Sequence, residues 1–187
     1  MVAQPLTKAK LLEALKRSGE EATTRLRALA PSVFESGRYE GGWNGRQILA
    51  HVAAIEWTYG RLIDVAKQAP SQPALGDAQS EVRRTTPEES GGVPTRSVRG
   101  GIDDYNARQV EKRAGATVAE LLDEFAANRA KTIAAVEAVD EGLLASPIRS
   151  AGGITGQLGS VIMAVAVQHV MMHVADITGE PWQEQRW

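Results

Sequence analysis

Apolar residues recur at the three- and four-residue spacing of an amphipathic helix in four long segments of the chain. These segments span about residues 7–29, 44–68, 117–139 and 155–178. Asn44 with Gln47, and Thr117 with Glu120, have the spacing of capping boxes at the start of the second and third segments. We find no convincing strand alternation and no internal repeat. The sequence therefore predicts an all-α protein built as a four-helix bundle.

The connection between the second and third segments is unusually long. From about residue 70 to residue 115 the chain is rich in proline and paired glycines, with one short helix expected at about 103–113. Short loops force neighbouring helices to run antiparallel, whereas a long crossover lets the second and third helices run parallel. We therefore expect an up-down-down-up bundle that forms a single domain over residues 1–187.

Composition excludes several classes of protein. With no cysteine among 187 residues, neither a disulfide framework nor a thiolate metal site is available. A net charge of −2 gives no electrostatic case for nucleic acid. The amino-terminal segment has no apolar signal core, so we expect a cytoplasmic protein. Residues 161–177 are apolar enough to consider as a membrane span, but they include two histidines and Asp176. We interpret them as a core helix and expect no membrane partner.

The three histidines of the chain are placed as metal ligands would be. His169 and His173 lie four residues apart, on one face of the last helix, and His51 lies in the second helix. Two imidazoles from one helix and one from a facing helix give a three-ligand site with an open position. A single histidine on an apolar helix is usually a core residue with satisfied hydrogen bonds. Burial without partners costs a few kcal/mol, so these three need hydrogen bonds or a metal.

Here the chain resembles a known family. The Trp43-Asn44 opening, His51 seven residues after Asn44, and the late H-x-x-x-H followed by VADI at 174–177 are similar to the DinB-like superfamily. That group includes YfiT-like metal-dependent hydrolases and mycothiol-dependent maleylpyruvate isomerases. The resemblance implies an up-down-down-up bundle, a divalent metal bound by the three histidines in a cleft, frequent homodimers, and use of a low-molecular-weight thiol. The isomerases commonly have an acidic ligand at the position of His169. A histidine there is closer to the general DinB pattern and weakens the assignment to the isomerases.

Several other residues have two open interpretations. Glu56 and Asp176 either orient imidazoles, as metal-bound histidines usually require, or are solvated helix positions. Tyr105 and Asn106, on the short crossover helix, either contact substrate above the metal or serve turn and packing roles. Four arginines are candidates for holding a substrate carboxylate, although most of the 21 lysines and arginines must be surface charge. These candidates are Arg46, Arg61, Arg108 and Arg129.

The first functional hypothesis is a metal-dependent enzyme acting on a small-molecule substrate. Three imidazoles suit zinc, nickel, copper or iron(II); zinc is expected for hydrolysis with activated water, or for transfer and isomerisation with a small thiol. The alternative is a non-catalytic metal-binding stress or sensing protein that acts through a partner. A third reading makes the histidines structural and the chain an interaction module. A catalytic site should open onto a cleft, whereas a structural site should be closed by protein ligands.

Overall fold

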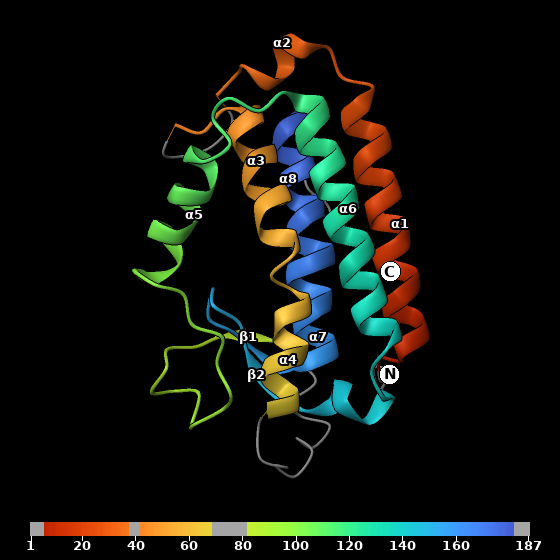
Figure 1. Ribbon diagram of the computed structural model, residues 1–187, viewed down its shortest axis with the longest axis vertical. Coiled ribbons are helices and arrows are strands. Elements are labelled where there is room, and N and C mark those ends of the chain that lie inside the picture. The colour runs from red at the N-terminus through yellow and green to blue at the C-terminus, as the bar shows by residue number, and fades with distance from the viewer. Residues whose placement is uncertain (1–5, 38–41, 69–81, 182–187) are drawn as a thin grey trace.

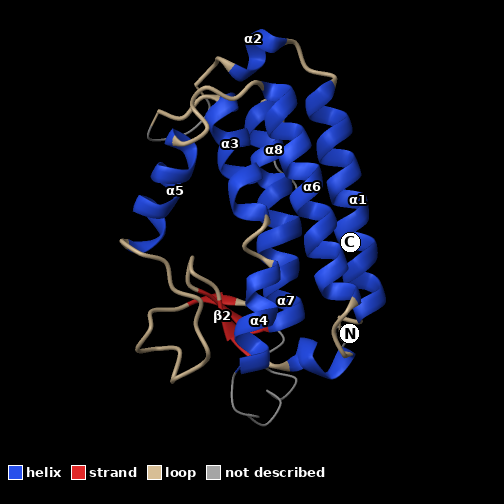
Figure 2. Cartoon of the chain, in the orientation of Figure 1, coloured by secondary structure: helices blue, strands red, loops and turns tan. Residues whose placement is uncertain are grey.

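The computed structural model describes residues 6–37, 42–68 and 82–181, and it is mostly helical (Figures 1 and 2). Long helices lie side by side, and a short helix, α5, stands apart from them beside α3. The α-helices are α1 (Lys8–Arg27), α2 (Pro31–Phe34), α3 (Gly45–Glu56), α4 (Gly60–Gln68), α5 (Gly101–Glu111), α6 (Val118–Glu137), α7 (Leu158–Ile162) and α8 (His169–Thr178). A 3-10 helix at Glu141–Ala145 follows α6, and a π-helix at Met163–Gln168 joins α7 to α8.

The long helices pack side by side as an elongated bundle. In Figure 1, α1 runs from the lower end to the upper end, α3 and α4 descend, α6 descends beside them, and α7 to α8 returns upward. The most extensive contacts join α3 to α6 and α1 to α6, and α8 packs against both α1 and α3. The helix from Leu158 to Thr178 has a mean hydropathy of 1.6 over its most apolar window, and 61% of that window is buried. Such burial is typical of a core helix, as its sequence predicted.

Both predicted capping boxes are present. Asn44 accepts a hydrogen bond from the Gln47 backbone nitrogen at 2.9 Å, and the Gln47 side chain accepts one from the Asn44 backbone nitrogen at 3.0 Å. Thr117 and Glu120 make the same reciprocal pair at the start of α6. These local hydrogen bonds fix where α3 and α6 begin.

The predicted second helix, 44–68, is broken into α3 and α4 by a turn at residues 57–59. The Thr58 hydroxyl donates to the Ile55 carbonyl at 2.6 Å. Such a bond offers the backbone an alternative to continued helix, and Gly60 just beyond has poor helix propensity. The apolar spacing continues across the break, because both halves pack against the same core, so periodicity alone could not reveal it.

The expectation of no strands is wrong. Three short strands form an antiparallel sheet in the order β1 (Arg83–Arg84), β3 (Ile154–Gln157), β2 (Pro147–Arg149), drawn in red at the lower end of Figure 2. The start of the predicted fourth helix, 155–157, is therefore strand, and the helix begins at Leu158. Strands of two to four residues are too short for alternation to be recognised in a sequence.

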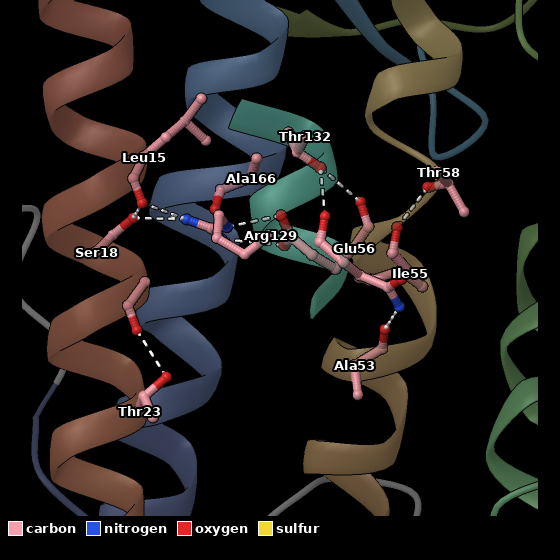
Figure 3. Close-up of polar contacts among 12 residues, drawn as sticks. Leu15, Ser18, Thr23, Ala53, Ile55, Glu56, Thr58, Arg129, Thr132 and Ala166 are labelled. Atoms are coloured by element: carbon pink, nitrogen blue, oxygen red, sulfur yellow. Dashed lines mark hydrogen bonds and ion pairs between the residues drawn. The ribbon is translucent and has the colours of Figure 1, made fainter. Parts of the chain in front are cut away.

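The core consists of two clusters of buried side chains. One includes Leu15, Tyr59 and Ala166, and the other includes Phe34 and Phe125. Between the helices that carry them runs a buried polar network centred on Arg129 of α6 (Figure 3). Its guanidinium lies 5.1 Å from the Phe125 ring centroid and donates to the Leu15 and Ala166 carbonyls, so it contacts both clusters.

Candidate metal centre

Packing of α3 against α8 brings the three histidines together. His51 lies in the second turn of α3, and His169 and His173 lie one turn apart on α8. One ligand atom from each imidazole lies within 4.8 Å of the other two. The ring centroids are 5.7 Å apart for His51 and His169, 5.2 Å for His51 and His173, and 4.4 Å for His169 and His173. The structure therefore places all three predicted residues at one point.

The π-helix ends immediately before His169. A π-turn holds one more residue than an α-turn, so it rotates every later side chain relative to a straight α-helix. Ala166, within this segment, accepts a hydrogen bond from the Arg129 guanidinium at 2.5 Å. The directions of His169 and His173 thus depend on a backbone irregularity that the apolar spacing of residues 155–178 could not indicate.

Asp176 orients one of the imidazoles. Its carboxylate lies 3.0 Å from Nδ1 of His173, and Nε2 of His173 lies 2.9 Å from Nε2 of His169. A carboxylate at Nδ1 favours the tautomer with the proton on that nitrogen, which leaves the Nε2 lone pair facing His169. Of the two interpretations of Asp176, the structure supports orientation of an imidazole.

Burial keeps at least two of the imidazoles neutral. Loss of solvation, and to a lesser extent the nearby His173, lowers the pKa of His51 to about 3. Burial and then the His173 and His51 imidazoles lower the pKa of His169 well below its ordinary value. Neutral imidazoles offer lone pairs, which is the form that binds metals. Within the described residues, Nδ1 of His51 is buried and has no hydrogen-bond partner.

The histidines open onto a cleft of about 470 Å³. Beside the histidines, its walls come from α5, from the turn at 150–152, from the α3–α4 turn and from the π-helix. Trp43 covers one side, with its ring centroid 5.3 Å from that of His51. A volume of this size is within the usual range for small-molecule sites. The arrangement is that of an open site, because one side of the imidazole cluster faces a cleft and not packed protein.

Tyr105 and Asn106 line this cleft from α5. The Tyr105 hydroxyl and the Asn106 side-chain oxygen are buried, and neither has a hydrogen-bond partner within the described residues. The Tyr59 hydroxyl, from the α3–α4 turn, is also buried without a hydrogen-bond partner among these residues. Buried polar atoms without partners are rare in folded proteins and suggest a missing ligand or water. The sequence analysis singled out Tyr105 and Asn106 but missed Tyr59.

Glu56 and Arg129 have a different role from the one expected. Glu56 is fully buried and accepts hydrogen bonds from the Arg129 guanidinium at 2.6 and 3.0 Å. Figure 3 shows this pair between α3 and α6, turned toward Ser18 and Ala166. Burial raises the pKa of Glu56, and Arg129 partly offsets that rise. Both interpretations of Glu56 are wrong, because it neither contacts an imidazole nor is solvated. The candidate Arg129 does not line the cleft either, since it neutralises Glu56 inside the bundle.

The remaining arginine candidates also lie elsewhere. Arg46 donates to the Ala114 carbonyl, Arg61 pairs with Asp64, and Arg108 donates to the Arg99 carbonyl. The cleft is lined by two other arginines, Arg84 and Arg96. Both lie in the irregular crossover, where no periodicity or motif distinguishes one arginine from another.

Comparison with known proteins gives one family match and two similar folds. The model of the DinB superfamily matches residues 14–177. YfiT from Bacillus subtilis, reported as a probable metal-dependent hydrolase with an unusual four-helix bundle topology, superposes with a TM-score of 0.63 at 14% identity. The alignment covers 92% of this chain and 84% of YfiT. A search among curated proteins gives no match.

A variant of the mycothiol-dependent maleylpyruvate isomerase superposes with a TM-score of 0.64 at 14% identity. This alignment covers 92% of our chain and 61% of the isomerase, so the chain corresponds to about three-fifths of that protein. At such low identity the two structures establish likeness of fold alone. The family match extends from the middle of α1 nearly to the end of α8, and the chain belongs to the DinB superfamily.

Proposed function

We propose that His51, His169 and His173 bind a divalent metal and that the chain is a metal-dependent enzyme acting on a small molecule. The observation that carries the proposal is the convergence of three imidazoles at the wall of an open cleft. Burial favours the neutral, ligating form of His51 and His169. The fold likeness to a reported hydrolase and to a thiol-dependent isomerase supports the same reading.

The residues fit a metal better than they fit a closed polar core. Nδ1 of His51 is buried without a partner, and Asp176 holds His173 with its other nitrogen directed to the cluster. Three imidazole ligands suit zinc first, and nickel or iron(II) bind the same donors. When bound, such a metal polarises a carbonyl or lowers the pKa of water or of a thiol.

The chain's own groups would bind and orient the substrate. The hydroxyls of Tyr59 and Tyr105 can donate hydrogen bonds into the cleft, and the Asn106 side-chain oxygen can accept one. Burial raises the pKa of Tyr59 well above its ordinary value, so its phenol stays protonated. Trp43 and α5 form part of the cleft wall. The proposal covers hydrolysis and transfer or isomerisation with a low-molecular-weight thiol, the two chemistries that the neighbouring structures represent.

Two further expectations belong to this proposal. The up-down-down-up order is supported by the shared direction of α3 and α6 in Figure 1. A homodimer is expected from the family resemblance, and light scattering of the purified protein would measure it.

Metal analysis of untagged protein is the first test. We expect one equivalent of divalent metal, lost in the triple alanine variant of the three histidines. A triple variant that still bound one equivalent with unchanged affinity would refute the assignment.

Cobalt substitution then separates an enzyme from a non-catalytic metal protein. The d–d spectrum of the cobalt protein should change when azide is added, because a three-ligand site leaves a position open. An unchanged spectrum would favour the stress or sensing alternative. Assays of ester and amide hydrolysis, and of thiol addition to an electrophile, would then choose the chemistry.

A further inference from the structure

Two guanidinium groups flank the cleft. Arg84 on β1 pairs with Ile154 on β3, and residues directly opposite in an antiparallel sheet project from the same face. Both line the cleft. Arg83, the preceding residue on β1, alternates to the other face. The hydroxyls of Thr85 and Thr155 lie 2.7 Å apart and hold these strands together. Arg84 and the three histidines line the same cleft.

Arg96 is held at the cleft by its backbone and by an aromatic ring. Its backbone nitrogen donates to the Arg149 carbonyl at 3.0 Å. Its guanidinium lies 5.8 Å from the Trp57 ring centroid, a cation–π distance. Arg96 and Tyr59 line the same cleft. The residue is half-buried and forms part of the cleft wall.

Arg84 and Arg96 differ from six other arginines of the chain in having no ion-pair partner within the part that the structure describes. Within the described residues, neither Arg84 nor Arg96 has a carboxylate at ion-pair distance. Six arginines do have such a partner: Arg25, Arg27, Arg46, Arg61, Arg113 and Arg129. Asp103 is the one acidic side chain among the described residues that line the cleft. Two guanidinium groups and one carboxylate leave the lining with a formal charge of +1 when the imidazoles are neutral.

Apart from the histidines, the rest of the lining is largely apolar, and three of its buried side-chain polar atoms have no hydrogen-bond partner among the described residues. Ile55, Leu62, Ile102 and Val165 are among the apolar members. The hydroxyls of Tyr59 and Tyr105 and the Asn106 oxygen are the unpartnered atoms. Leaving a buried donor or acceptor unsatisfied costs about 1–3 kcal/mol, so these atoms indicate a ligand with polar groups of its own on an apolar body.

We propose that the cleft binds a small organic monoanion, with its carboxylate at Arg84 and Arg96 and its reacting end toward the histidines. Guanidinium forks match a carboxylate in geometry and hold it by two parallel hydrogen bonds. In the metal-free form, the two guanidinium groups and Asp103 leave one positive charge, which a single carboxylate balances. The inference deepens the proposed function by naming the substrate class, and it rests on that proposal only in taking the cleft as the substrate site.

The test measures binding of acids and of their neutral amides to the whole chain. Benzoate, phenylacetate and hydrocinnamate, each beside its amide, would be titrated by calorimetry into metal-free and zinc-loaded protein at pH 8. We expect at least one acid to bind more tightly than its amide in both forms. Arg84→Gln or Arg96→Gln should weaken that acid by about 10- to 100-fold, as expected for loss of a charged hydrogen bond, and leave the amide unchanged.

Two matched controls come from the same structure. Arg83→Gln removes the neighbouring guanidinium on the other face of β1. Arg61→Gln removes the second guanidinium over Trp57, also at 5.8 Å, which lies outside the cleft lining. Neither should change acid binding.

Three outcomes would overturn the proposal. In the first, no acid binds more tightly than its amide at up to 10 mM in either form of the protein. In the others, acid binding is unchanged in the double Arg84→Gln/Arg96→Gln variant, or it requires zinc and is unaffected by substitution of either arginine. Zinc stoichiometry, measured on the same samples, reports separately on the metal site. Failure of the metal proposal and failure of the anion proposal are therefore distinguishable.

Discussion

Replacement of Arg129 by methionine should destabilise the protein severely. The residue is 3% exposed, and its five N–H donors are matched by five contacts to oxygen acceptors. Two go to Glu56 at 2.6 and 3.0 Å, and one each goes to Leu15, Ser18 and Ala166 at 3.0, 2.8 and 2.5 Å. Methionine fills much of the volume but leaves the Glu56 carboxylate buried without its counter-ion. Breaking a buried pair in this way costs about 3–5 kcal/mol. A chain of this size should lose about 6–20 °C in Tm.

The double variant Arg129→Met/Glu56→Leu distinguishes an uncompensated charge from a simple packing defect. When both charges are removed, the desolvation penalty disappears with them, so the double variant should be more stable than Arg129→Met alone. Urea unfolding followed by circular dichroism at 222 nm measures the unfolding free energies of Arg129→Met, Glu56→Leu and the double variant, and the coupling between the two substitutions. Arg27→Met is a matched control, because Arg27 pairs with Asp123 on the surface, where ion pairs contribute little.

The reasoning would be refuted if Arg129→Met lost less than about 1 kcal/mol, the size of an ordinary substitution. It would also be refuted if the double variant lost as much as the two single variants together. The pH dependence of the stability loss in Arg129→Met is an independent test. Without Arg129, Glu56 must protonate to remain buried, so the deficit of the single variant should be smaller at pH 5 than at pH 8.

Three other predictions concern the site and its support. Asp176→Asn should weaken zinc binding by about 10- to 100-fold, and His51→Ala should weaken it further, both measured by competition with a chromophoric chelator. In metal-free protein the unfolding free energy should fall as pH drops from about 6.5 toward 3, because His51 and His169 bind protons in the unfolded chain but not in the folded protein. The fall should reach up to about 1.4 kcal/mol per pH unit for each histidine that stays neutral on folding. In urea titrations, His51→Gln should make this pH dependence weaker. Gly45→Ala should cost about 1–3 kcal/mol, since a Cβ there would lie 3.0 Å from the Phe34 backbone, and a Tm unchanged by the substitution would contradict that reasoning.

The parts of the fold that the sequence predicted are those encoded locally. Asn44 with Gln47 and Thr117 with Glu120 place a donor and an acceptor three residues apart, so α3 and α6 begin where their caps indicate. The break at Thr58 and the π-helix at Met163–Gln168 are different, because they depend on how each segment packs against the rest of the bundle. Apolar spacing continues through both features, and so it conceals them.

The same distinction divides the residues of the cleft. His169 and His173 lie four residues apart, and one helical turn suffices to bring them together. His51 could be added because a bundle with two apolar helices must pack them face to face. Arg84 reaches the cleft only because β1 pairs with a strand about seventy residues later in the chain.

Arg96 reaches the cleft in a similar way, because its backbone is bonded to Arg149 on β2. A three-stranded sheet with strands of two to four residues leaves no periodic trace, so nothing in the crossover marked these two arginines among the 21 basic residues of the chain. The placement of the three candidate metal ligands is therefore set by helix geometry, which a sequence displays. The placement of the charge proposed to select the substrate is set by strand pairing, which a sequence does not display. Variants of Arg84 and Arg96 consequently test the part of the function that only the structure could suggest.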